Sequence, residues 1–295
     1  MTGPMGAPNS KKARAHRVLA LLFALGMCSP QALADPDVDL TPQTLQAFDR
    51  YVQATERRND TDLARPGTFL HIEALPEPGR SEAPASVRKG EIYMEQLRTP
   101  DSSGRVIEAP GGLIHHWVGA VFIPGVALRK VLDLVEDYDH HENVYKPEVV
   151  RSRLLKHEGN DYKIYYRLRK KKVITVTLNT EHDVQYFSLD ATHCRSRSVS
   201  TRIAEVVDAD QRGEREKPVG HDSGFLWRMN SYWRFEEKDQ GVYVEVESIS
   251  LTRDIPTGLG WLIRPFITGI PRESLLMTLG STRSALAASS HAGTS

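Results

Sequence analysis

The stretch Phe225 to Arg253, FLWRMNSYWRFEEKDQGVYVEVESISLTR, decides the fold class of this chain. It holds two segments, 225–236 and 241–253, in which apolar and polar side chains alternate with the period of two that is typical of β-strands. The turn-forming sequence Lys238-Asp239-Gln240-Gly241 separates them. Strands joined by so short a turn pair antiparallel, so the stretch predicts a β-hairpin.

Similar patterns extend the sheet upstream of this hairpin. Alternation and β-branched residues predict further strands at 113–123, 163–169, 173–179, 181–189 and 196–207. After the first of these strands, an amphipathic helix is predicted, followed by a second short helical turn within 137–145. The apolar face of the first helix is formed by Leu128, Val131, Leu132, Val135 and Tyr138.

A long helix is predicted after the last strand, beginning at Pro271, because proline suits the first helical position. Its apolar stripe consists of Leu275, Leu276, Leu279 and Leu286. The order of one strand, two helices, a run of antiparallel strands and a C-terminal helix predicts an α+β fold.

The composition excludes several classes of protein. The 295 residues carry 38 basic and 38 acidic side chains, so net charge gives no reason to expect a nucleic-acid partner. Two cysteines cannot form a disulfide scaffold, and 21 Gly with 17 Pro are too few for a collagen-like or low-complexity chain. What these numbers leave is a globular protein of one large or two modest domains.

The N-terminus predicts export. Basic residues precede the apolar run 18–27, and Ala32-Leu33-Ala34 places small residues where signal peptidase cleaves. The apolar run is too short to span a membrane, which needs roughly 20 residues. We expect residues 1–34 to be a signal peptide, with cleavage near Ala34 and a periplasmic or secreted product. Cys194 would then be the single cysteine of the mature chain, and a half-buried strand position is expected for it.

Residues 35–111 differ in character from residues 112–288. Thr41-Pro42 opens a short amphipathic helix that is expected to pack outside the main domain. Six prolines between Arg65 and Pro110 predict a lead-in without long regular elements, containing one or two short strands. We expect the main domain to span residues 112–288 and to be followed by a disordered tail at 289–295.

Several motifs carry a resemblance to a known superfamily. They are Phe122-Ile123-Pro124-Gly125 before a helix, Tyr145-Lys146-Pro147 before a strand, and Asp254-Ile255-Pro256 after the last strand. With the element order, they make residues 112–288 similar to the START/Bet v 1-like (SRPBCC) superfamily of polyketide cyclase/dehydrase and lipid transport proteins. The motifs mark a fold and are not a catalytic signature.

The resemblance implies a helix-grip fold, in which a curved antiparallel sheet wraps around the C-terminal helix. It also implies a cavity between sheet and helix for a hydrophobic ligand such as a lipid, a sterol or a polyketide. Concave apolar spaces of this kind are where small molecules bind. A hydrophobic molecule or lipid is therefore the expected partner, with no cofactor and no metal.

Polar side chains within the apolar strands are the candidates for binding the polar end of such a ligand. Alternation places Arg228, Asn230, Tyr232 and Arg234 on one side of their strand, and it groups Tyr243, Glu245, Glu247 and Arg253 in the same way. The sequence does not say which side is concave, and cross-strand surface ion pairs are the alternative. The full set of candidate ligand-binding residues is Arg202, Arg228, Asn230, Tyr232, Arg234, Glu245, Glu247, Trp261, Phe266, Leu275 and Leu279.

The segment 258–267, GLGWLIRPFI, lies between the last strand and the C-terminal helix and is glycine-hinged and apolar. It is expected to be a lid over the cavity mouth, a tip that inserts Trp261 and Phe266 into a membrane surface, or a loop helix packed on the sheet edge. The histidines at 115–116 and within 139–142 have no recognised metal-ligand spacing, and a solvated helix end is favoured for 139–142.

Three functions fit these observations. The first is an exported, cofactor-free binding protein for a hydrophobic ligand. The second is a cyclase- or dehydratase-like enzyme in the same cavity, with His116, Asp139 or Glu247 as general acid or base. The third is an interaction domain with a filled core. Because no paired acid–base motif occurs, the sequence favours binding over catalysis.

Overall fold

The computed structural model describes residues 1–2, 37–172, 174–255 and 260–292, with side chains in the last range from 268 to 288. The chain divides into two units, Met1–Pro36 and Asp37–Ser295, and the second contains the folded domain. Apart from its first two residues, the predicted signal peptide lies outside the described residues.

One antiparallel sheet dominates the described part of the chain. Its strands follow the order β2-β3-β11-β10-β7-β6-β5-β4, and the short strand β8 pairs with β7. The bounds are β2 Tyr93–Gln96, β3 Gly112–Pro124, β4 Val149–Glu158, β5 Asp161–Lys171, β6 Thr175–Ser188, β7 His193–Val207, β8 Arg215–Glu216, β10 Arg228–Lys238 and β11 Gly241–Arg253. The strands β1 (Val38–Asp39) and β9 (His221–Asp222) pair separately.

The predicted hairpin is confirmed as β10 and β11, which pair from Arg228 with Leu251 to Lys238 with Gly241. Asp239 and Gln240 form its two-residue turn with positive φ angles of 57° and 61°. Two consecutive residues in the left-handed conformation give the turn a twist that matches the twist of the flanking strands. The turn therefore fixes the register, and with it the face that each side chain of the hairpin occupies.

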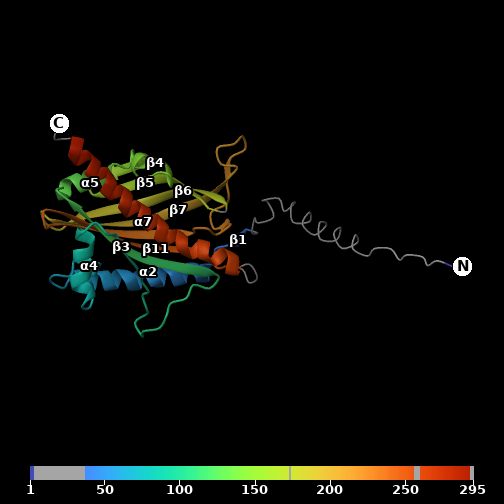
Figure 1. Ribbon diagram of the computed structural model, residues 1–295, viewed down its shortest axis with the longest axis horizontal. Helices are drawn as coiled ribbons and strands as arrows, with labels where there is room; N and C mark the ends of the chain where they lie inside the picture. The colour runs from blue at the N-terminus through green and yellow to red at the C-terminus, as the bar shows by residue number, and fades with distance from the viewer. Residues whose placement is uncertain (3–36, 173, 256–259, 293–295) are drawn as a thin grey trace. The chain divides into compact units, whose positions relative to one another are not determined.

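Six helices accompany the strands in the described residues. They are α2 Pro42–Leu63, α3 His71–Ala74, α4 Gly79–Arg88, α5 Leu128–Glu136, α6 His141–Val144 and α7 Gly260–Ala292. Figure 1 shows the long helix α7 crossing the strands, with α5 near one of its ends. Leu275, Leu279 and Leu286 of α7 pack with Val244 and Phe235 in one core cluster between helix and sheet.

The opposite face of the sheet is covered by the N-terminal helices. Phe48 and Tyr51 of α2 pack with Ile249 and Leu251 of β11. The helices α3 and α4 pack on Phe122 and Tyr243 in a third cluster. The sheet is thus the middle of three layers, and the odd-numbered residues of β11 face the N-terminal layer.

Gly119 lets α7 approach β3 closely. A Cβ at this position would lie 2.7 Å from Leu279 Cδ1 and 2.6 Å from Met94 Sδ. Contacts of that length are steric clashes, so a side chain here would require the Met94 and Leu279 side chains to shift. The sequence pattern places Gly119 within a predicted strand but gives no reason for a glycine there.

The structure corrects three predicted elements. The helix α7 begins at Gly260 and not at Pro271, and it continues to Ala292 instead of ending before 289. Residues 260–267 are therefore helical in backbone and not a loop. The predicted strands 173–179 and 181–189 are one strand, β6. It is continuous because the alternation passes through the buried Thr180.

The lead-in is more regular than its prolines suggest. One short strand, β2, occurs as predicted, but α3 and the ten-residue helix α4 were not expected. Pro84 lies inside α4, and the buried Ala83 and Val87 hold this helix against the sheet. Tertiary packing thus outweighs the cost of the proline.

Candidate functional site

The layer between the sheet and α7 is apolar, with neutral polar side chains at one end. Residues of β3, β10 and β11 form its centre together with α5 and α7. Hydrophobic side chains that are only partly buried border this cluster. They are Ile92, Met94, Trp117, Leu134, Leu154, Tyr162, Tyr166 and Trp233.

A group of tyrosines and histidines forms the polar end of this layer. His141 of α6 is 3% exposed, and its Nδ1 lies 2.7 Å from Tyr166 Oη of β5. The hydroxyls of Tyr138 and Tyr186 are 2.9 Å apart, and Tyr186 Oη donates to the carbonyl of Val135 at 3.2 Å. Reasoning from the sequence missed this group, because its four residues come from four separate segments.

These side chains are uncharged near neutral pH. Burial lowers the pKa of His141 to about 4 and lowers that of His182 on β6 to about 4. Burial raises the pKa of Tyr145 to about 12, against the hydrogen bond with Thr282, and also raises that of Tyr138. Buried neutral hydroxyls and imidazoles can exchange hydrogen bonds with a ligand's hydroxyl or carbonyl group without the cost of burying a charge.

The substitution Tyr166→Phe should destabilise the protein by about 1–3 kcal/mol, because it leaves the buried His141 Nδ1 without its partner. Urea denaturation measures the change. The neighbouring Tyr165→Phe is the matched control, since it removes one bond to Asn179 Oδ1 at 2.8 Å on the other face of the same strand. Equal losses in the two variants would contradict a special role for the His141 bond.

An open groove of about 500 Å³ lies between α6 and α7, next to this polar group. Its walls are formed by Asn143, Val144, Met277, Gly280, Ser281, Ser284 and Ala285. The adjacent residues Tyr145 and Thr282 are buried, and their hydroxyls are 3.2 Å apart. These two buried residues follow the wall residues Val144 and Ser281 directly in the chain.

A second polar cluster lies on the other side of the sheet, under α2. Glu247 is 4% exposed and forms an ion pair with Arg58. Its carboxylate also accepts hydrogen bonds from His116 Nε2 at 2.6 Å and from Asn59 Nδ2 at 2.9 Å. Burial opposes ionisation of Glu247, but these bonds and the Arg58 charge outweigh it and hold the pKa below its usual range.

The partners of His116 define its tautomer. Nε2 carries the proton, because it faces the carboxylate of Glu247, so Nδ1 accepts from Tyr51 Oη at 2.9 Å. Tyr51 Oη in turn accepts the backbone N–H of Thr99 at 2.9 Å. Burial lowers the pKa of His116 despite the hydrogen bond to Glu247, so the imidazole is neutral. Every polar atom of the imidazole is satisfied within the fold.

Glu245, two residues before Glu247 on β11, is a second buried carboxylate with several partners. Its carboxylate accepts the backbone N–H of His71 at 2.8 and 2.9 Å and pairs with Arg234 Nη1 at 3.3 Å. Burial raises the pKa of Glu245. Glu245 and Glu247 thus fasten α3 and α2 to the sheet.

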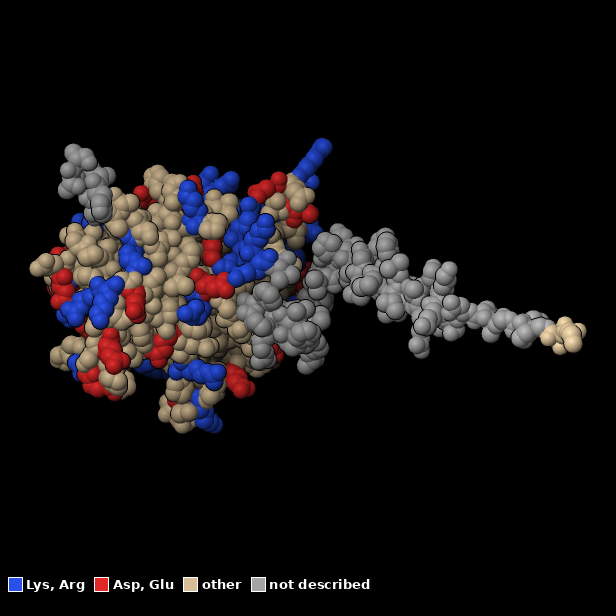
Figure 2. Space-filling model, viewed as in Figure 1, with Lys and Arg blue, Asp and Glu red and all other residues tan. Residues whose placement is uncertain are grey.

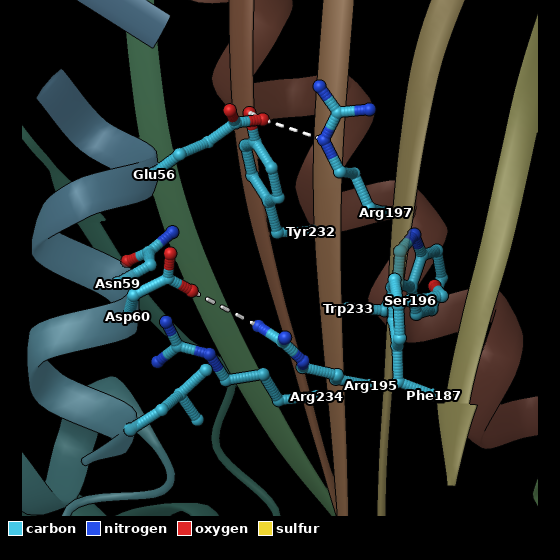
Figure 3. Close-up of a pocket in the computed structure, with 11 residues that line it drawn as sticks. Glu56, Asn59, Asp60, Phe187, Arg195, Ser196, Arg197, Tyr232, Trp233 and Arg234 are labelled. Atoms are coloured by element: carbon cyan, nitrogen blue, oxygen red, sulfur yellow. Dashed lines mark hydrogen bonds and ion pairs between the residues drawn. The ribbon is translucent and has the colours of Figure 1, made fainter. Parts of the chain in front are cut away.

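A small cavity of about 220 Å³ lies where α2 passes over β7 and β10 (Figure 3). Glu56, Asn59 and Asp60 extend from α2, and Arg195, Arg197, Tyr232 and Arg234 from the strands (Figure 3). Arg197 Nε donates to Glu56 Oε1 at 2.7 Å, and Tyr232 Oη donates to the same oxygen at 2.9 Å.

The structure brings part of the predicted ligand-binding set together, but not where it was expected. Tyr232 and Arg234 line the small cavity, with Glu245 and Glu247 next to it. All four face the N-terminal helices, so they cannot contact a ligand held between the sheet and α7. The alternation grouped them correctly, but only the packing of α2 and α7 decides which face is which.

Of the other predicted residues, Asn230 borders this cluster through Tyr232, and the rest are separate from it. Arg228 Nη1 donates to the carbonyl of Trp227 at 2.8 Å, and Asn230 Nδ2 is 3.5 Å from Tyr232 Oη. Arg202 pairs with Glu216 at the surface. Leu275 and Leu279 are buried against the sheet in the α7 layer. The side chains of Trp261 and Phe266 lie outside the described residues.

The three candidate catalytic residues do not form one site. His116 and Glu247 meet, but His116 is 1% exposed and fully hydrogen-bonded. Asp139 lies elsewhere, exposed, where Oδ1 accepts the backbone N–H of Leu154 at 2.9 Å. The expectation of a solvated helix end at 139–142 is wrong for His141, which is buried because α6 turns it inward against Tyr166.

Basic and acidic side chains are interspersed over the face that carries α7, around a broad area without charge (Figure 2). In the part of the chain that the structure describes, no helix is both long and apolar enough to span a membrane. Within the same residues, no group of three or more His, Cys, Asp or Glu side chains is placed to bind a metal ion.

No protein-family model matches the chain, and no curated protein matches it in sequence. Three similar solved structures have 17%, 7% and 12% identity and TM-scores of 0.42, 0.40 and 0.38. The first covers 65% of this chain and 98% of its own, the second 58% and 96%, and the third 59% and 94%. They are, in that order, a STAR-related lipid transfer protein from Xanthomonas axonopodis, a START superfamily protein from Mycobacterium smegmatis and the Zhui aromatase/cyclase from a Streptomyces species.

The chain's own elements identify its architecture. Two short helices, α5 and α6, follow β3, and α7 lies against the sheet after β11. The strand β4 begins at Val149, two residues after Pro147, and β11 ends at Arg253 directly before Asp254, as the resemblance predicts. With its antiparallel sheet held against a long C-terminal helix, the chain has a helix-grip fold.

Proposed function

We propose that this protein is an exported binding protein that holds a hydrophobic ligand between the sheet and α7. The ligand carries a hydroxyl or carbonyl group, which reaches the tyrosine and histidine group around His141. Export rests on the signal-peptide pattern of residues 1–34 and is tested by the mass of the mature protein recovered outside the cytoplasm.

The observation that carries this proposal is the separation of charge between the two faces of the sheet. On β10 and β11, the buried charged residues Arg234, Glu245 and Glu247 alternate with Phe235, Val244 and Val246 of the α7 layer, which are uncharged. A layer that combines apolar walls with a few neutral polar groups is typical of sites for apolar small molecules.

Trp117 supports a ligand with a hydrogen-bond acceptor. It lies on β3 beside the α7 core cluster, and its Nε1 is buried without an acceptor among the described residues. Buried donors are nearly always paired in native proteins. A ligand oxygen would pair this one, and the α6–α7 groove is the proposed entrance.

We expect the mature protein, purified from the host's own extracytoplasmic fraction, to carry a stoichiometric apolar molecule. Native mass spectrometry followed by organic extraction detects and identifies it. Added back at 100 times its dissociation constant, that molecule should raise the unfolding free energy by about 2.7 kcal/mol. Recovery of the molecule unchanged after incubation distinguishes binding from catalysis.

A matched pair of variants places the ligand on one face. Trp117→Phe removes the unpaired donor of the α7 layer and should weaken binding, whereas Arg197→Gln changes the α2 side of the sheet and should leave it intact. Protein that carries no molecule and gains no stability from added lipids would refute the proposal in favour of a filled core. Contact of segment 258–267 with a membrane stays a prediction, which flotation with phosphatidylglycerol vesicles tests.

A further inference from the structure

The small cavity under α2 contains a guanidinium, that of Arg195, that the fold pairs only weakly. Arg195 and Arg234 occupy directly opposite positions on β7 and β10, and both line the cavity. Like charges at directly opposite positions destabilise a sheet. Arg234 is balanced by Glu245, which leaves the question of what balances Arg195.

Arg195 has only a weak partner. Its Nη1 lies 3.5 Å from Asp60 Oδ1, at the limit of a hydrogen bond, and the Asp60 side chain is 71% exposed. Its Nε is buried and donates to no acceptor in the described part of the chain. The guanidinium carbon lies 4.8 Å from the ring centroid of Phe187, which supports the group from behind.

The remaining polar groups of the cavity already have partners. Glu56 accepts from both Arg197 and Tyr232, and Asn59 Nδ2 donates to Glu247. Among the cavity residues, Arg195 has a buried donor, Nε, without an acceptor in the described part of the chain. A guanidinium offers parallel N–H groups that match the two oxygens of a carboxylate.

We propose that this cavity is a second binding site, specific for the carboxylate of a small molecule, with Arg195 as its main contact. The carboxylate would lie between Arg195 and Arg234, take the free Nε donor and displace Asp60. The volume of about 220 Å³ is comparable to roughly seven water molecules at about 30 Å³ each, so the ligand is small.

The position of the site separates it from the ligand proposed above. It lies on the α2 side of the sheet, and the apolar layer lies on the α7 side. The two sites can therefore be occupied independently, and failure of one proposal leaves the other standing.

Titration calorimetry with succinate, at low chloride, tests the site in the mature protein. Arg195→Gln should weaken succinate binding about tenfold or more, because a charge-assisted bidentate contact is lost. Asp60→Asn should strengthen it, because the competing carboxylate is removed. A cavity that only needs Arg195 for packing would not respond to Asp60→Asn in this direction.

Arg169→Gln is the matched control. The Arg169 side chain is 31% exposed and pairs with an exposed aspartate, Asp210, much as Arg195 is 33% exposed and contacts Asp60. The substitution Arg169→Gln removes the same charge outside the cavity, so succinate binding should not change. Melting temperatures of all variants establish that they are folded, and Arg195→Lys, which keeps the charge without the bidentate geometry, should bind succinate weakly.

Inorganic phosphate is the second probe. Binding of phosphate without binding of succinate would overturn the assignment to carboxylates. Succinate binding that Arg195→Gln and Arg169→Gln reduce equally would overturn the site, because it would reflect net charge alone. If neither the unmodified protein nor the Asp60→Asn variant binds succinate, the proposed site is also overturned.

Discussion

The free energy of unfolding should fall steeply as the pH decreases from about 6.5 to about 4. His115, His141 and His182 are buried, and burial lowers the pKa of each to about 4. In the unfolded chain each would have its ordinary pKa of about 6.5. Between these values the unfolded chain binds protons that the folded protein does not, so acid favours unfolding.

The expected magnitude is large. At pH 5.5, each of the three histidines should cost about 1.4 kcal/mol relative to pH 7.5. Total stabilities of proteins are about 5–15 kcal/mol, so the loss is a large fraction of the whole. Well above pH 6.5, the three histidines are neutral in both the folded and the unfolded chain, so they cause no loss of stability. Urea denaturation at pH 7.5, 6.5 and 5.5 measures the decline.

Two variants test the cause of this decline. His115→Gln can keep a hydrogen bond to Thr252 Oγ1, which lies 3.0 Å from His115 Nε2. It should reduce the loss between pH 7.5 and 5.5 by about 1.4 kcal/mol. His157→Gln changes an exposed histidine and should leave the loss nearly unchanged. The same pH profile in all three proteins would show that buried histidines are not responsible.

The substitution Glu247→Gln should destabilise the protein by about 3–5 kcal/mol, because it removes the charge that compensates Arg58 within a buried network. The amide would also face two donors, His116 Nε2 and Asn59 Nδ2, with only one acceptor oxygen. Denaturation at pH 7.5 gives the magnitude, and hydrogen exchange should show α2 losing protection first.

The surface pair of Glu216 and Arg202 is the control for this prediction. Both side chains are about one-third exposed, and Glu216→Gln should cost about 1 kcal/mol or less. A loss for Glu247→Gln as small as this would mean that the network does not hold α2 on the sheet. The depressed pKa of Glu247 adds to acid sensitivity, since its contribution is present above the unfolded pKa near 4.3 and lost as the pH falls below it.

These two predictions concern opposite faces of one sheet. The histidine prediction depends mainly on the α7 layer, where neutral polar groups lie among apolar side chains. The Glu247 prediction depends on the α2 layer, where charged residues fasten the N-terminal helices. The sheet therefore separates a layer suited to an apolar ligand from a layer that contains the arginine-lined cavity.

Local sequence patterns were sufficient to predict most elements of the domain and the grouping of side chains on its strands. A period of two in β10 and β11 and the turn at Asp239 and Gln240 depend on neighbouring residues only, so the hairpin could be predicted from them. Local signals were less reliable at prolines. Pro271 suggested a helix start, yet α7 begins at Gly260 and passes through this proline.

Only the folded structure shows which layer of helices covers each side of the sheet. Alternation placed Tyr232, Arg234, Glu245 and Glu247 together, but their burial under α2 depends on where two distant helices pack. The group around His141 also required the fold, since its members come from separate segments. Hydrogen bonds between residues 25 or 188 positions apart, such as His141 with Tyr166 and Asn59 with Glu247, leave no periodic signal in the sequence.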